Sequence, residues 1–188
     1  MTQRKQGRYG RRFRYALLPC ALLCFMYGLW GSMEVFTGNA GGFRFTYFEA
    51  VLPLLGVTVI ATLLLSLLLA LLPRRHFTRA MVLVFALALC SYVQNLVLNL
   101  DLGLLDGEQV KWENYTAHGW KNLAVWAAML IAVCALLLAL KKRTRRVLRV
   151  ASALLLAVQV VSFGVVSVQH LTSDAPSARD PTYVLTGD

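Results

Sequence analysis

The sequence predicts an all-α, polytopic membrane protein with five transmembrane helices, a cytoplasmic N-terminus and an extracellular C-terminus. Composition is the first reason: 58% of the 188 residues are apolar, only 15% are charged, and the mean hydropathy is +0.61. Soluble domains carry roughly 25% charged residues. The second reason is that the apolar residues lie in five long uncharged blocks, and the third is that basic residues gather between alternate blocks.

Each block is long enough to cross a bilayer as a helix. The five blocks contain no Asp, Glu, Lys or Arg and are Ala16–Met33, Ala50–Leu72, Ala80–Leu100, Asn122–Leu140 and Val150–Ser173. About 20 helical residues cross the hydrocarbon core, where backbone groups must be hydrogen-bonded within a helix or a closed barrel. The blocks lack the alternating pattern of a barrel strand. We therefore predict spans at about 16–36, 47–72, 80–100, 121–140 and 148–170.

The basic residues determine the predicted orientation. Fifteen of the 19 Lys and Arg residues lie in segments 1–15, 73–79 and 141–149, whereas the nine Asp and Glu residues lie on the other side or at its border. Short loops rich in Lys and Arg stay in the cytoplasm. Residues 1–15 are thus predicted to form a basic cytoplasmic N-terminus, and residues 172–188 an extracellular linker.

The same distribution predicts the surroundings of the chain. Basic segments attract anionic lipids by about 1 kcal/mol per residue near the surface. We therefore expect a location in the cell membrane, with anionic lipids of the bilayer on the cytoplasmic side as partners. Nucleic acid is not expected, because no zinc spacing or RNA-binding motif accompanies the net charge of +10.

No metal or other cofactor is expected in this chain. The cysteines, Cys20, Cys24, Cys90 and Cys134, all lie within apolar blocks, and Cys20 and Cys24 share a helix face without a His or carboxylate neighbour. Cysteines in such places usually behave as small buried hydrophobes. The three histidines are far apart in the sequence and lack the spacing of metal ligands.

The most informative polar stretch ends the third block and continues into the following loop. Asn95 and Asn99 are four residues apart on one helix face, with Gln94 adjacent. Amides in an apolar span must face the bundle interior or a polar cavity. The stretch is either a hydrogen-bonded helix end or the floor of a site for a lipid headgroup or a tethered domain. The candidate contact residues are Gln94, Asn95, Asn99, Asp106 and Trp112.

A second candidate precedes the second block. The segment Phe43–Glu49 contains four aromatic residues, and amphipathic rings accumulate at the membrane–water interface. The segment either anchors the start of the second helix or forms part of an outer lipid-headgroup site, with Arg44 and Glu49 as its polar members.

Two later blocks carry residues typical of helix–helix contacts. In the fourth block, Ala124, Ala128 and Ala132 form a row of small residues, which predicts a packing face. The fifth carries Ser152, Gln159, Ser162 and Gln169, and isolated Gln residues in a span are expected to form polar contacts between helices.

The polar stretch also carries a resemblance to a known family. A Tyr-x-Gln-x-x-x-x-Asn run leads into Gly-x-Leu-Asp-Gly-x-x-x-x-Trp, at Tyr92, Gln94, Asn99, Gly103, Leu105, Asp106, Gly107 and Trp112. This pattern resembles the membrane domain of bacterial sulfatase-like proteins of the alkaline phosphatase superfamily, distant relatives of lipoteichoic acid synthases. The aromatic segment Phe43–Glu49 and the tail Pro181–Asp188 are similar to theirs as well.

The resemblance implies a membrane anchor for an extracellular catalytic domain that acts on lipid-linked or cell-envelope substrates at the outer leaflet. Its implied partners are a lipid-linked substrate or that domain. The family's metal ligands and its Thr or Ser nucleophile have no counterpart in these residues, so an enzymatic role of this chain stays open. The alternative is a self-contained five-span scaffold or lipid-binding accessory protein of a membrane complex.

The polar stretch gives a first testable prediction. Replacing Asn99 by Leu removes an amide that needs a partner inside the bundle, so we expect a loss of about 1 kcal/mol of stability. The matched variant Asn39→Leu changes a residue of a Gly-rich loop and is expected to behave as the parent. Thermal unfolding of the purified protein in detergent measures both, and equal behaviour of the two variants would contradict the prediction.

Overall fold

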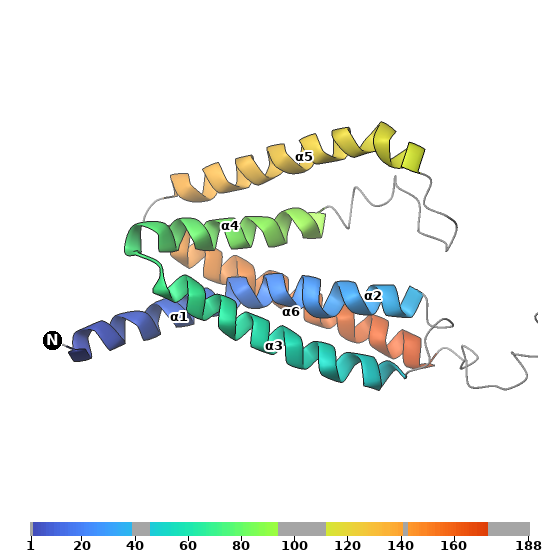
Figure 1. Cartoon of the computed structure of the whole chain (residues 1–188), viewed down its shortest axis with the longest axis horizontal. Coiled ribbons are helices and arrows are strands. Elements are labelled where there is room, and N and C mark those ends of the chain that lie inside the picture. Colours follow the sequence, from blue (N-terminus) through green and yellow to red (C-terminus); the bar gives the residue numbers. More distant parts are fainter. Residues whose placement is uncertain (1, 39–45, 94–111, 141–142, 173–188) are drawn as a thin grey trace, which may run out of the picture.

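The computed structural model describes residues 2–38, 46–93, 112–140 and 143–172, whose regular structure is helical throughout. In chain order the helices are α1 (Thr2–Cys24), the π-helix η1 (Phe25–Trp30), α2 (Gly31–Gly38), α3 (Tyr47–Leu71), α4 (Arg74–Val93), α5 (Trp112–Ala139) and α6 (Thr144–Thr172). Because α1, η1 and α2 follow one another without interruption, they form one rod. The described residues thus form five helical rods (Figure 1).

Four of the rods are long and apolar enough to cross a membrane. Their spanning stretches are Tyr9–Thr37, Tyr47–Leu71, Arg74–Val93 and Thr144–Thr172. In α5 the described apolar stretch, Leu123–Ala139, is shorter. The all-helical class predicted from the sequence is confirmed. Four of the five predicted spans correspond to helices that are long and apolar enough to cross a membrane.

The exposure of the side chains of α3 indicates whether the bundle is surrounded by water or by lipid. Thr58 and Ser66 on its buried side are 5% and 0% exposed, whereas Ile60 and Leu64 on the opposite side are 59% and 56% exposed. In water a helix would bury its aliphatic side instead. The reverse arrangement is stable where the surroundings are as apolar as the side chains, as they are in lipid. Together with the four long apolar rods, this distribution identifies a multi-pass membrane protein.

The first rod occupies the middle of the bundle. Its α1 part contacts α3, α4 and α6, whereas α5 packs mainly against α4 at the edge of the bundle (Figure 1). Helices α4 and α6 begin at the end of the bundle from which α1 enters, and α5 runs alongside α4 in the opposite direction (Figure 1). The first rod therefore holds three of its neighbours together.

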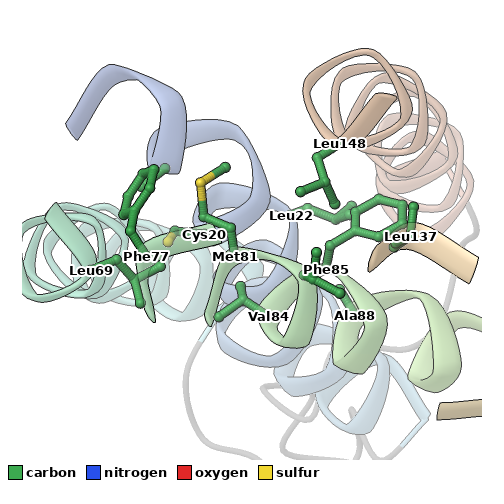
Figure 2. Close-up of a cluster of buried hydrophobic side chains, with 12 residues drawn as sticks. Cys20, Leu22, Leu69, Phe77, Met81, Val84, Phe85, Ala88, Leu137 and Leu148 are labelled. Carbon is green, nitrogen blue, oxygen red and sulfur yellow. The ribbon is translucent and has the colours of Figure 1, made fainter. Parts of the chain in front are cut away.

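The larger buried cluster contains side chains from all five rods. In Figure 2, Cys20 and Leu22 of α1 lie close to side chains of the other helices. These are Leu69 of α3, Phe77, Met81, Val84, Phe85 and Ala88 of α4, Leu137 of α5 and Leu148 of α6. Cys20 and Cys90 are buried as predicted, Cys24 and Cys134 are only partly buried, and all four cysteines are free.

Small side chains let the first rod approach α3 closely. Three pairs of residues face each other along this contact: Gly28 and Thr58, Cys24 and Thr62, and Cys20 and Ser66. Each step of four residues along the first rod meets an equal step in the opposite direction along α3, as antiparallel helices require. We call this contact the α1–α3 seam. A Cβ atom added at Gly28 would lie 2.7 Å from the Thr58 Oγ1 atom, so a side chain fits at this position only if Thr58 moves.

The π-helix lies at the same level as this close contact. The backbone N–H of Gly31 donates to the carbonyl of Met26, five residues earlier, which is the π-helical pattern. Tyr27 in the same segment shares a hydrogen bond with Ser91 of α4. The segment η1 therefore joins the first rod to α3 through Gly28 and to α4 through Tyr27.

Several helices begin earlier than the apolar blocks predicted. The first rod begins at Thr2 rather than 16, α4 at Arg74 rather than 80, and α6 at Thr144 rather than 148. These added turns contain Arg, which favours helix formation and keeps its charged head in water while its stem covers apolar surface. Uncharged blocks therefore predict where the spans lie, but they place the helix starts too late because they leave out the charged first turns.

The structure differs from the prediction for the alanine row of α5. Ala124, Ala128 and Ala132 are exposed, and α5 contacts the core through Cys134 and Leu137 instead. Small-residue spacing shows that a face is able to pack, but it does not determine which face meets a neighbour in the same chain. Of the four polar residues expected to face the bundle in α6, Ser152 and Gln159 are buried, whereas Ser162 and Gln169 are exposed.

The α1–α3 seam gives a prediction with a matched control. Gly28→Leu forces the two helices apart, so we expect it to lower stability by about 1–3 kcal/mol. Gly56→Leu places the same side chain on α3 where a Cβ meets nothing within 4 Å, and it is expected to leave stability unchanged. Retention of the monodisperse peak after heating in detergent measures both variants, and a similar loss in the two would contradict the close contact at Gly28.

Candidate lipid-binding site at the acidic end

The two ends of the bundle carry charged side chains of opposite sign. Arg11, Arg12, Arg74 and Arg145 surround one pocket at the end where α4 and α6 begin; we call this the basic end. The opposite end, which we call the acidic end, carries Glu34 of α2 and Glu49 in the first turn of α3. The prediction that the basic segments meet on one side of the protein is confirmed for these arginines.

Most of the residues predicted to contact a lipid or partner lie outside the described residues. These are Arg44, Gln94, Asn95, Asn99 and Asp106. Trp112 is the first residue of α5, and its side chain is also outside the described part. Glu49 is therefore the candidate whose surroundings can be examined, and the site is built from it.

Glu49 fixes the start of α3. Its Oε2 atom accepts hydrogen bonds from the backbone N–H of Thr46 at 2.6 Å and from the Thr46 hydroxyl at 2.9 Å. In return, the Glu49 N–H donates to the Thr46 Oγ1 atom at 3.4 Å. This reciprocal pair is a capping box, which satisfies backbone N–H groups that have no partner within the helix. One role of Glu49 is thus structural.

The same carboxylate borders an apolar pocket between α2 and α3. The pocket has a volume of about 350 Å³ and is lined by Ser32, Val35, Phe36, Glu49, Ala50, Pro53 and Leu54. Its walls are mostly hydrocarbon, with the Ser32 hydroxyl and the Glu49 carboxylate as polar groups. An apolar cavity with a few polar groups at its edge is the usual form of a site for an amphipathic ligand.

A second pocket lies on the other side of α2, against α6. It has a volume of about 160 Å³ and is lined by Trp30, Met33, Glu34, Thr37, Tyr47, Phe163 and Val166. The ring of Trp30 packs on that of Phe163, with centroids 5.8 Å apart. Tyr47 shares a hydrogen bond with Ser167 of α6, which holds the start of α3 against the end of α6.

Aromatic contacts connect the two pockets. The ring of Phe36 lies 6.3 Å from that of Tyr47 and 6.2 Å from that of His170, and Tyr47 lies 5.4 Å from His170. The two pairs that involve Phe36 are edge-to-face, and such pairs contribute about 0.5–1.5 kcal/mol beyond the area they bury. The acidic end is therefore a packed aromatic platform with an exposed carboxylate on each side of α2.

Sequence reasoning placed Tyr47 in an aromatic segment but did not find Trp30, Glu34, Phe163 or His170. Together with Tyr47 these residues lie on three different rods, so no local spacing connects them. The excess of aromatic residues near the ends of the apolar blocks was the available signal.

The groups that the described part of the acidic end presents are carboxylates, hydroxyls and apolar side chains. Among the described residues no group of three His, Cys, Asp or Glu side chains is placed to hold a metal ion. What the described end offers is two carboxylates, the hydroxyls of Ser32 and Thr37, and apolar walls. Comparison with models of known protein families, with curated proteins and with solved structures found no match.

The capping role of Glu49 is separable from its charge. Gln at this position can still accept the bond from the Thr46 N–H, so we expect Glu49→Gln to keep the cap and to lose the favourable interaction of the charge with the helix dipole, about 0.3–1 kcal/mol. Glu49→Ala removes the capping bonds as well and is expected to lose about twice as much. Thermal unfolding in detergent compares them, and equal losses would show that the capping box contributes little.

Proposed function

We propose that this chain is the membrane domain of a sulfatase-like enzyme that acts on lipid-linked or cell-envelope substrates, and that it crosses the cell membrane five times with its N-terminus inside. The observation that carries the topology is the separation of charge between the two ends of the bundle. Short segments rich in Lys and Arg are retained in the cytoplasm during insertion. The basic end would then face the cytoplasm and the acidic end the outer surface.

The course of the chain supports a fifth crossing by α5. Helix α4 begins at the basic end, and α6 begins there as well, so the chain between them must return along the bundle (Figure 1). Helix α5 has 28 residues, which is about 42 Å of helix and more than the thickness of a hydrocarbon core. Its N-terminal turns contain Glu113 and Lys121, which lie nearer the polar surface in this arrangement.

The acidic end would then lie at the outer leaflet, where it is suited to hold a lipid. The pocket beside Glu49 opens between two helices with exposed apolar sides, so an acyl chain can occupy it while the headgroup lies near Glu49 and Ser32. This supports a role in presenting a lipid-linked substrate to a catalytic domain outside the membrane. The sulfatase-like assignment itself is supported by the sequence pattern around Tyr92–Trp112, most of which lies outside the described residues.

Reading the gene beyond Asp188, and the neighbouring open reading frames, tests the sulfatase-like assignment. The proposal expects a domain of several hundred residues with metal ligands and a Thr or Ser nucleophile. A stop codon after Asp188 without any sulfatase-like neighbour would contradict it.

A scaffold or accessory subunit of a membrane complex is the second candidate, and the exposed alanine row of α5 favours it. Ala124, Ala128 and Ala132 form a small-residue face on the outer side of the bundle that no described helix of this chain covers. Faces of this kind allow close helix–helix contact in lipid. Recovery of the chain as a stable complex with another membrane protein, lost in an Ala128→Leu variant, would favour this candidate.

The topology is testable by cysteine labelling. In a background without the four native cysteines, Gly107→Cys is expected to react with an impermeant maleimide added outside intact cells, and Arg143→Cys only after the membrane is opened. Arg143 is chosen because it is exposed at the basic end, next to the buried Thr144. Labelling of Arg143→Cys in intact cells, or protection of Gly107→Cys there, would contradict an inward basic end.

A further inference from the structure

The pocket at the basic end is built by three segments that are distant in sequence. Arg11, Arg12 and Tyr15 come from α1, Arg74 from the first residue of α4, and Arg145 from the first turn of α6. Together they line a pocket of about 310 Å³. Four guanidinium groups around one cavity repel one another, so their convergence needs a physical explanation.

Two of these guanidinium groups are oriented by uncharged partners. Arg12 Nη1 donates a hydrogen bond of 2.7 Å to the carbonyl of Leu72 at the end of α3. Arg145 donates through Nε and Nη2 to the Thr78 hydroxyl at 3.3 and 3.1 Å. These contacts hold the side chains in position without neutralising their charge. The remaining N–H groups of each guanidinium stay available as donors, because arginine has five.

The buried ring of Phe77 lies close to both of these arginines. The guanidinium carbon atoms of Arg12 and Arg145 lie 5.8 and 5.9 Å from its centroid, within the range of cation–π attraction. Beside the pocket, the guanidinium of Arg149 lies 4.2 Å from the centroid of Tyr15. The arrangement is therefore built into the packing of α1, α4 and α6 rather than formed by loose surface side chains.

The acidic residues among the described ones, Glu34, Glu49 and Glu113, do not lie at this end of the bundle. Residues 1–33, 50–100 and 114–173 contain no Asp or Glu, and Glu49 is at the far end of α3. That helix has 25 residues and is about 37 Å long, so Glu49 is too far away to form an ion pair with these arginines. Helices α4 and α6 also begin here without an acidic residue in the first turn, so their positive dipole ends add to the potential.

We propose that this pocket binds a single phosphate group, supplied either by the headgroup of an anionic phospholipid or by free phosphate. Planar guanidinium groups match the oxygen geometry of phosphate and form strong, charge-assisted hydrogen bonds with it. The pocket lies where membrane-spanning helices end, which is the level of lipid headgroups. This goes beyond a diffuse attraction between basic loops and the membrane, since it predicts one site in which particular arginines matter and others do not.

Substitutions at Arg74 and Arg79 distinguish binding in this pocket from a general attraction of anions to the basic surface. Both are exposed residues of α4 with the same charge, but Arg74 lines the pocket and Arg79 does not. Replacing Arg74 by Gln leaves the contacts of Arg12 and Arg145 with α3 and α4 in place, so the protein is expected to fold. Arg12→Lys is a second variant, which keeps the charge but removes the planar fork.

Native mass spectrometry of the full chain, released from nanodiscs of phosphatidylcholine with a tenth of phosphatidylglycerol, measures retained lipid. We expect one phosphatidylglycerol to be retained in preference to phosphatidylcholine, with affinity lowered roughly five- to tenfold in Arg74→Gln and in Arg12→Lys. Arg79→Gln is expected to change it by less than about twofold. Thermal stabilisation by inorganic phosphate in lipid-free detergent, present in the parent and lost in Arg74→Gln, would identify free phosphate as the source.

Either source supports a phosphate site, and binding of both does so as well. The proposal is overturned if Arg74→Gln and Arg79→Gln weaken retention equally, because the attraction is then diffuse. It is also overturned if the parent protein shows no preference for phosphatidylglycerol over phosphatidylcholine and no response to phosphate.

Discussion

The close contact between the first rod and α3 is the interaction on which the rest of the bundle depends. Lipid tails are as apolar as leucine, so burying aliphatic side chains provides little force between helices in a membrane. Dispersion contacts and polar contacts between closely spaced backbones provide it instead. Gly28, Cys24 and Cys20 present the small surface that makes this possible, and the Thr and Ser side chains of α3 fill the space opposite them.

The first rod contributes residues to both ends of the bundle, and its position determines which residues of the other helices they contact. Once α1 lies against α3, α4 and α6, Arg12 reaches the end of α3 and lies, like Arg145, close to the ring of Phe77. At the other end, the same rod carries Trp30 to Phe163 and Phe36 to Tyr47. The arginine cluster therefore lies at one end of the bundle, and the aromatic platform with its carboxylates lies at the other. This separation of charge supports the proposed orientation.

The helical class and the division of charge could be predicted from the sequence because each depends on local composition. Uncharged blocks longer than 17 residues have few alternatives to a helix in lipid. The partners of each helix could not be predicted, since small residues occur on several faces: the row at Ala124 is exposed, whereas the row that continues from Cys24 to Gly28 forms the seam. For the sites, the sequence identified Glu49 but not its pocket, and it placed the arginines on one side without showing which of them converge.

Formation of a disulfide across the α1–α3 seam is the most direct test of this account. With Cys24 as the sole native cysteine, a cysteine introduced at Thr62 faces it, whereas one introduced at Leu63 is on the exposed side of α3. Mild oxidation in native membranes, followed by mass spectrometry of linked peptides, should give rapid linkage of position 24 to position 62 and almost none to position 63. Equal linkage at the two positions, or linkage at 63 alone, would contradict the seam and with it the arrangement of both ends.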